Sequence, residues 1–194
     1  MQKLRFVIQI LIISIFISMF CFSCKKKYTP KPRGFFRIDL PKKSYVKLSS
    51  NYPYSFNYAN CANVNNNPNP ENKYWINIEY PKINGIIHIS YLPIKNNFAK
   101  IVEETRKLAY KHTIKADAIN EKIYSNHEKK VYGILYEIEG NAASSVQFFL
   151  TDSIHNYLRG ALYFSSNPNK DSLAPVINYV KEDIKVLIET FEWN

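Results

Sequence analysis

A stripe of apolar residues at helical spacing, near the end of the chain, most strongly constrains the fold. Its members are Val176, Ile177, Val180, Ile184, Leu187, Ile188 and Phe191. This spacing predicts an amphipathic helix that Asp171 or Ser172 caps, with Pro175 in its first turn. A second stripe, which begins at Phe98, predicts another amphipathic helix over Asn96–Ala118. Each helix has one apolar face, and that face needs a sheet to pack against.

Short alternating runs supply the strands of such a sheet. Tyr74–Tyr80 and Ile86–Leu92 predict a hairpin, because Asn84-Gly85 provides the positive φ that a tight turn requires. Further strands are expected at Tyr52–Tyr58, around Lys122–Tyr124, and at Val131–Glu139, Ser145–Thr151 and Tyr157–Phe164. Asn60–Asn72 is rich in Asn and Pro, which predicts a loop. We therefore expect one α+β domain over residues 52–194, mainly an antiparallel sheet covered by two amphipathic helices.

The first 24 residues have the pattern of an exported lipoprotein. A short cationic segment precedes the apolar run Phe6–Phe22, which is shorter than the roughly 20 residues of a spanning helix. Ser23 is a small residue directly before Cys24, as at the end of a bacterial lipobox, where the Cys thiol takes a diacylglyceryl group. We expect residues 1–23 to be the signal peptide and Cys24 to be the lipid anchor. An uncleaved signal anchor is the alternative.

Residues 24–51 predict a basic, Pro-containing tether between the lipid and the domain. Nine of the 26 Lys and Arg residues lie between residues 24 and 47, against one acid. From residue 48 onwards, cations and acids balance. A nucleic-acid-binding domain carries its basic surface on the fold itself, so the net charge of +10 does not indicate a nucleic-acid partner. A basic leader behind an acyl chain suits a membrane surface instead. The alternatives are engagement of an acidic partner, or charge repulsion that keeps the tether extended.

One part of the tether is more apolar than a spacer needs to be. The segment Gly34–Pro41 reads GFFRIDLP. It either packs back along the domain or docks on a partner, and in both cases Phe35 and Phe36 would be the anchors, with Arg37 beside them. Cys61 is expected to be buried or unreactive, because removal of Cys21 and acylation of Cys24 leave it without a disulfide partner.

The sequence shows no strong catalytic or metal-binding pattern, and no cofactor is expected. The four histidines share no metal-ligand spacing. A hydrolase would need a placed nucleophile and base, and only Asp152 with His155 suggests such a pair. A turn in which Asp152 accepts backbone N–H groups is a commoner reason for that spacing. Glu137 and Glu139 share one face of a strand, which suits a glycosidase but also a solvent-exposed face. We therefore expect no enzyme.

Aromatic residues are concentrated in Tyr52–Tyr58 and Tyr74–Tyr80. They could line a groove in which sugar rings stack, although aromatic residues on strands more often form the core and cross-strand pairs. A periplasmic module that binds a glycan or another small ligand is therefore the alternative function.

The leader and the C-terminal part carry a specific resemblance. The segment Pro30–Pro41, PKPRGFFRIDLP, followed by Tyr52–Phe56, YPYSF, resembles the gliding-motility lipoprotein GldD family of Bacteroidota. Phe149–Asp152, Leu158–Phe164 and Asp171–Val176 are similar to the C-terminal part of that family. The resemblance implies a non-enzymatic lipoprotein that is required for gliding and associated with the type IX secretion machinery. The order of elements also resembles the Mog1/PsbP-type sandwich, a fold-level analogy only.

The resemblance also bears on location and partners. Surface display in this phylum is thought to favour acids soon after the lipidated Cys, whereas Lys25, Lys26 and Lys27 follow Cys24. We therefore expect the periplasmic face of the outer membrane. The expected role is a lipid-anchored, non-catalytic subunit or assembly factor, with other gliding or secretion proteins as its partners.

Overall fold

The structure is a computed structural model that describes residues 5, 7, 8, 11, 38–49, 51–67, 70–166 and 169–194. The chain forms two compact units, Met1–Gly34 and Phe35–Asn194. In the first unit, Arg5, Val7, Ile8 and Leu11 are helical. No helix among the described residues is long and apolar enough to cross a membrane. All the strands described below belong to the second unit.

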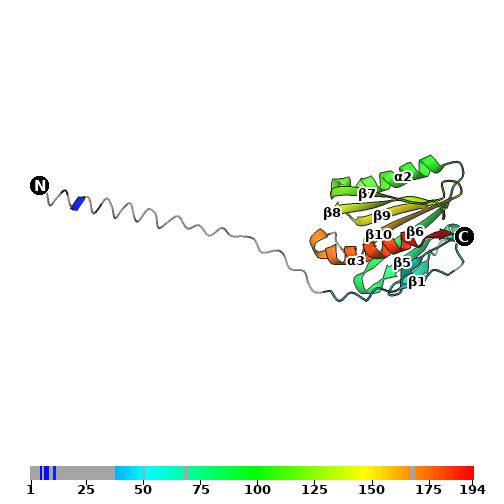
Figure 1. The fold of residues 1–194 in the computed structure, drawn as a ribbon, viewed down its shortest axis with the longest axis horizontal. Coiled ribbons are helices and arrows are strands. Elements are labelled where there is room, and N and C mark those ends of the chain that lie inside the picture. Colours follow the sequence, from blue (N-terminus) through cyan, green and yellow to red (C-terminus); the bar gives the residue numbers. More distant parts are fainter. Residues whose placement is uncertain are drawn as a thin grey trace. The chain divides into compact units, whose positions relative to one another are not determined.

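In the described part of the chain, a seven-stranded antiparallel sheet forms the centre of the second unit (Figure 1). The strand order is β4-β5-β6-β10-β9-β8-β7. The strands are β4 (Asn63–Asn66), β5 (Ile76–Tyr80), β6 (Gly85–Pro93), β7 (Ala116–Asn126), β8 (Val131–Gly140), β9 (Ser144–Thr151) and β10 (Asn156–Phe164). Strands β7 to β10 follow one another in space as in the sequence, because short turns join them. This confirms the predicted antiparallel sheet.

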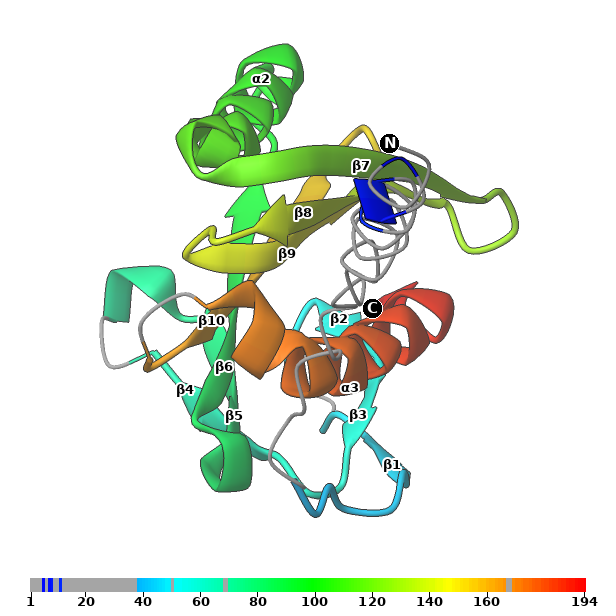
Figure 2. The ribbon, with the colours of Figure 1, turned by 90° about the vertical axis from the view of Figure 1, so that its left-hand side faces the viewer.

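Helices α2 (Phe98–Tyr110) and α3 (Lys170–Glu189) cover opposite faces of this sheet (Figures 1 and 2). Consecutive residues of a strand point to opposite faces, and β9 shows the consequence. Phe148 belongs to the core cluster that contains α3, whereas Phe149 belongs to the cluster that contains α2. The predicted α+β architecture with a helix-covered sheet is therefore confirmed.

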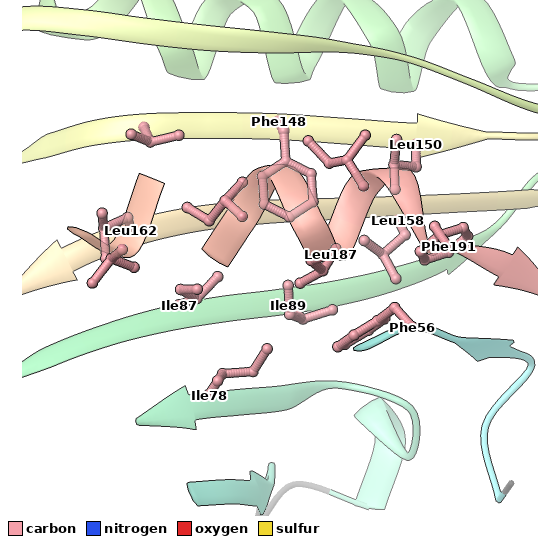
Figure 3. Close-up of a cluster of buried hydrophobic side chains, with 14 of the residues drawn as sticks. Phe56, Ile78, Ile87, Ile89, Phe148, Leu150, Leu158, Leu162, Leu187 and Phe191 are labelled. Atoms are coloured by element: carbon pink, nitrogen blue, oxygen red, sulfur yellow. The ribbon is translucent and has the colours of Figure 1, made fainter. Parts of the chain in front are cut away.

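The larger core lies between α3 and the sheet. Figure 3 shows side chains of β5, β6, β9 and β10 gathered against Leu187 of α3 and against Phe191. Phe56, Phe148, Leu158, Leu162 and Phe191 are each at most 1% exposed. Full burial of one such side chain stabilises a fold by about 1.5–3 kcal/mol, so this layer dominates the stability of the domain.

Two short ladders extend this core beside α3. Strand β1 (Tyr45–Lys47) pairs with β3 (Asn57–Ala59), and β2 (Tyr54–Ser55) pairs with β11 (Glu192–Trp193). The expected single strand at residues 52–58 is therefore two strands in different ladders. Leu48 is only 5% exposed and joins the core. Leu40, Tyr45 and Leu48, which we expected to be part of the tether, thus pack on the domain.

The predicted helix over Asn96–Ala118 was too long. Helix α2 ends at Tyr110, a 3-10 turn, η3 (Lys111–Ile114), follows, and β7 begins at Ala116. Strand β7 pairs with β8 from Ala116 opposite Gly140 to Asn126 opposite Val131. The backbone hydrogen bonds of that long ladder outweigh the helical preference of the Ala and Lys residues at this point.

Two further sequence predictions were wrong in detail. The expected loop at Asn60–Asn72 contains β4, an edge strand whose Val64 packs on the core, followed by the 3-10 turn η1 (Pro70–Asn72). An edge strand pairs on one side only, which makes Asn tolerable there. Helix α3 begins earlier than expected, because the side chain of Asn169 accepts a hydrogen bond from the Ser172 N–H at 3.2 Å. Pro175 consequently lies in the second turn.

Candidate functional site

A buried carboxylate on α3 fixes the end of the leader to the domain. Asp183 is only 2% exposed. Its Oδ1 accepts hydrogen bonds from Lys43 Nζ at 2.5 Å and from the Tyr45 hydroxyl at 3.0 Å. A buried carboxylate is costly unless it is paired and hydrogen-bonded, so these contacts hold the leader firmly against α3. We call Lys43, Tyr45, Tyr179 and Asp183 the leader lock.

Tyr179, one helical turn before Asp183, completes the leader lock. Its hydroxyl donates to the Pro41 carbonyl oxygen at 3.0 Å, and its own carbonyl oxygen accepts from Lys43 Nζ at 2.5 Å. Lys43 Nζ also lies 3.5 Å from the centroid of the Tyr179 ring, which is a cation–π contact. Cys61 Sγ lies 3.6 Å from the Tyr179 hydroxyl. Cys61, which we expected to be buried or unreactive, is half-buried beside the leader lock.

The phenols around Asp183 remain protonated at neutral pH. Burial, followed by the hydrogen bond to Asp183, raises the pKa of Tyr45 to about 12. Burial and then the charge of Asp183 raise the pKa of the neighbouring Tyr80 well above its ordinary value. Burial and then the contact with Cys61 do the same for the pKa of Tyr179. These hydroxyls therefore act as hydrogen-bond donors throughout the physiological range.

The sequence reasoning missed this site, although a signal was present. Asp183 lies three residues after Val180 and four before Leu187, inside the apolar stripe of α3. An acid at such a position is rarely buried unless a cation pairs with it. That position indicated a buried partner, and the partner is Lys43.

Cys24, Phe35, Phe36 and Arg37 lie outside the described residues. Leu40, which follows them closely, packs against the core cluster of α3.

The Asp152–His155 turn has an ordinary structural use. Asp152 Oδ1 accepts hydrogen bonds from the N–H groups of Ile154, His155 and Asn156 at 2.8–2.9 Å. Its Oδ2 accepts from Asn156 Nδ2 at 2.7 Å. Burial opposes ionisation, but these donors outweigh it and hold the pKa of Asp152 below its usual value. The carboxylate is therefore engaged in the turn, as the commoner explanation of the spacing predicted.

Glu137 and Glu139 likewise accept hydrogen bonds from neighbouring side chains. Glu137 is buried and accepts hydrogen bonds from Lys122 Nζ at 2.8 Å and from Lys181 Nζ at 2.7 Å. Burial raises the pKa of Glu137, but both lysines lower it more, so the group stays ionised. Glu139 accepts a hydrogen bond from Asn120. Both acids line a hollow of about 380 Å³ beside α3. Across the described ranges, no group of His, Cys, Asp or Glu has an arrangement suited to a metal ion.

A second hollow, of about 420 Å³, lies where β5 begins and β6 ends. We call it the aromatic hollow, and its lining residues are Glu71, Asn72, Lys73, Tyr74, Trp75, Tyr91, Leu92 and Pro93. Most other aromatic residues of the two aromatic-rich segments are buried: Tyr54, Phe56 and Tyr80 are 0–3% exposed in the core. The expectation that strand aromatics form the core is thus met by those three, whereas Tyr74 and Trp75 line open space.

Residues 25–193 match the family described as "Gliding motility lipoprotein GldD". The chain belongs to the GldD family. The match covers nearly all of the chain, including the leader lock and the aromatic hollow, and it confirms the family resemblance seen in the sequence. No curated protein matches this GldD-family chain.

The solved structures support the fold. The solution structure of cyanobacterial PsbP (CyanoP) from Synechocystis sp. PCC 6803 has a TM-score of 0.50 to this chain. The two sequences are 10% identical, and the match covers 80% of this chain and 96% of CyanoP. At this identity the likeness concerns the fold alone, and it confirms the PsbP-like sandwich that the order of elements predicted.

Proposed function

We propose that this GldD-family chain is a lipid-anchored, non-catalytic subunit or assembly factor of the gliding-motility and type IX secretion apparatus. Cys24 would carry the lipid at the periplasmic face of the outer membrane, and residues 1–23 would be removed as a signal peptide. The family match supports a role in gliding motility. The position of Cys24 after an apolar run, before a basic leader, supports the anchor.

The observation that carries this proposal is the leader lock. A lipid-anchored protein that only needs to stay near a membrane can be joined to its tether by a flexible linker. Here the ion pair between Lys43 and a buried Asp183 fixes the leader to α3. Such a junction sets the point at which the leader leaves the domain, as suits a component with a fixed position in an assembly.

The leader lock lies close in sequence to the proposed partner-binding residues. Pro41 is bonded to Tyr179, and Phe35 precedes Pro41 by six residues. Six extended residues span at most about 20 Å, which is the farthest that the chain between Phe35 and Pro41 could reach. A partner that binds these three residues would therefore also meet the domain surface around the leader lock.

The anchor is tested by metabolic labelling with an alkyne fatty acid. Wild-type protein should take up the label, and Cys24→Ser should not. Cys61→Ser is the matched control, because it removes a thiol that lies against Tyr179, and it should label like wild type. Labelling of the Cys24→Ser protein would contradict the proposed anchor.

The partner is tested by capture from detergent-solubilised membranes. Wild type should bring down gliding or secretion components, and Phe35→Ala/Phe36→Ala should lose them while its circular dichroism spectrum is unchanged. Arg37→Gln should weaken capture and make it less dependent on salt. Ile154→Ala is the control, since it removes an apolar side chain that is 65% exposed in the Asp152 turn. Equal capture by all variants would place the interface on the domain rather than on the leader.

A further inference from the structure

Two hydrogen bonds and one ring contact within the protein hold the three aromatic side chains of the aromatic hollow in place. Trp75 Nε1 donates to the Tyr91 carbonyl oxygen at 2.8 Å. The Tyr91 hydroxyl donates to Asn156 Oδ1 at 2.6 Å. The Tyr74 ring packs edge-on against the Tyr91 ring, with centroids 5.7 Å apart and an interplanar angle of 88°. Because these hydrogen bonds and the ring contact fix the three rings, a ligand in the hollow would meet a preformed surface.

The same bonds decide what the aromatic residues offer to a ligand. The indole N–H of Trp75 and the hydroxyl hydrogen of Tyr91 are already donated inside the protein. These residues therefore present ring carbon rather than hydrogen-bond donors. Polar groups are supplied next to them by Asn72 and Lys73, which line the same hollow. Lys73 Nζ lies 5.3 Å from the centroid of the Tyr74 ring.

Flat aromatic carbon beside amide and ammonium groups matches the chemistry of a sugar ring. A pyranose has an apolar face of C–H groups, which stacks on an aromatic ring, and an edge of hydroxyls, which hydrogen-bonds to polar side chains. A volume of about 420 Å³ lies in the range of small-molecule sites, which is about 300–1,000 Å³. A purely apolar ligand would leave the amide of Asn72 and the ammonium of Lys73 unused.

The aromatic hollow lies away from the leader lock. Pro41, beside the leader lock, shares a small pocket with Lys82 and Ile83, in the turn that joins β5 to β6. Trp75 lies just before the opposite end of β5, and β5 runs from Ile76 to Tyr80. Five strand residues span about 17 Å, so a bound ligand does not compete with the leader for space.

We propose that the aromatic hollow binds a glycan. Pyranose rings stack on Tyr74 and Trp75, and Asn72 and Lys73 hydrogen-bond to their hydroxyl groups. This inference goes beyond the proposed role in gliding and does not depend on acylation of Cys24. Its failure would leave the anchor and the capture experiments unaffected.

The chain offers a direct fluorescence test, because it contains only two tryptophans, Trp75 and Trp193. Trp193 packs edge-on against Phe191, so Trp193→Phe retains an aromatic contact there and leaves Trp75 as the single reporter. The full chain is purified in a detergent without a sugar headgroup. It is then titrated with β-1,4-linked glucose oligosaccharides and, separately, with β-1,4-linked N-acetylglucosamine oligosaccharides. We expect a saturable change in Trp75 emission with at least one of them.

Variants in the Trp193→Phe background separate stacking from nonspecific effects. Tyr74→Ala should weaken binding at least tenfold, and it keeps the bond from the Tyr54 hydroxyl, which goes to the main-chain oxygen of residue 74. Lys73→Ala, an exposed substitution, should weaken binding severalfold. Tyr132→Ala is the matched control, because Tyr132 packs against His127 outside the hollow, and it should bind like the parent.

The titrations identify the source of the sugar. Preference for the N-acetylglucosamine series indicates an amino-sugar polymer such as that of a cell wall, and preference for the glucose series indicates a neutral polysaccharide. No saturable change with either series would overturn the proposal. Binding that both Tyr74→Ala and Lys73→Ala leave unchanged would also overturn it, as would saturable binding of a proline-rich peptide in the absence of any glycan response.

Discussion

Removal of the Lys43 ammonium is the sharpest test of the leader lock. Lys43→Met keeps most of the apolar stem of the side chain and deletes its charge. The Asp183 carboxylate, at 2% exposure, then retains only the Tyr45 hydroxyl among its described donors to Oδ1. The domain should lose stability, because a buried charge without its counterion is strongly unfavourable.

The magnitude follows from the burial of the two partners. Loss of one member of a buried ion pair costs about 3–5 kcal/mol. The Lys43 side chain is 31% exposed, so solvent already screens part of this interaction, and Tyr45 continues to stabilise the carboxylate. We therefore expect Lys43→Met to lower the free energy of unfolding by about 2–3 kcal/mol. Asp183→Asn should cost less, about 1–2 kcal/mol, because the Lys43 ammonium can then reach water.

The assay is urea unfolding of the full chain, followed by far-UV circular dichroism. Lys47→Met is the matched control. Lys47 is four residues further along the leader, and its pair with Glu192 is loose, at 3.7 Å with a lysine side chain that is 66% exposed. Such a surface pair contributes little, so this variant should stay within about 0.5 kcal/mol of wild type.

The double variant Lys43→Met/Asp183→Asn decides whether the two residues act as a pair. Its loss should be smaller than the sum of the single losses, by about 1–2 kcal/mol, because neither charge is then left alone. Additive losses, or a Lys43→Met protein as stable as Lys47→Met, would refute the reasoning about the leader lock.

Three further outcomes are expected. Gly160→Ala should lower stability by about 1–3 kcal/mol, because an added Cβ would lie 2.2 Å from the Phe148 ring. In a Phe148→Leu background, part of the resulting loss in melting temperature should be recovered. A Gly160→Ala protein with an unchanged melting temperature would contradict the close contact. Asn169→Ala should cost about 1 kcal/mol by uncapping α3, as measured by urea unfolding. Burial lowers the pKa of His88, and burial followed by Arg159 lowers the pKa of His112, so the unfolded chain binds more protons than the folded one just below pH 6.5. Stability should therefore be complete above about pH 6.5 and fall as the pH drops below it, with a smaller fall in His112→Asn; an equal fall in that variant would contradict the assignment.

The sequence predicted the fold best where a single periodicity holds over a whole element. Most of the predicted stripe, from Val180 to Ile188, lies on the core side of α3, and Phe191, just after the helix, packs in the same core. The turn at Asn84-Gly85 joins β5 and β6 as expected. Asn84 adopts a φ of 50°, the left-handed conformation that this turn prediction required. Neighbouring residues determine both the helix and the turn, so the local sequence was enough to predict them.

The sequence predicted less where a distant partner decides the outcome. The stretch from Lys111 to Ala118 has helical composition, but the end of this stretch pairs with β8 and belongs to β7. Strand β4 likewise depends on a partner outside the Asn-rich stretch, because Val64 pairs with Ile78 of β5. The leader lock joins residues about 140 positions apart, so the only sequence signal for it was Asp183, an acid inside the apolar stripe of α3. The aromatic hollow depends on which rings the fold leaves uncovered.

The leader lock has a mechanical consequence. Pro41 and Lys43 precede β1 in the chain, so if Cys24 carries the proposed lipid, tension on the leader would reach their contacts with α3 before it reaches the β1–β3 ladder. Rupture of the leader lock alone would release residues 38–44 and lengthen the tether by roughly 23 Å while the sheet stays folded. In the proposed lipid-anchored form, the contacts of Pro41 and Lys43 with α3 would therefore set how far the domain can move from the membrane before the sheet itself bears load.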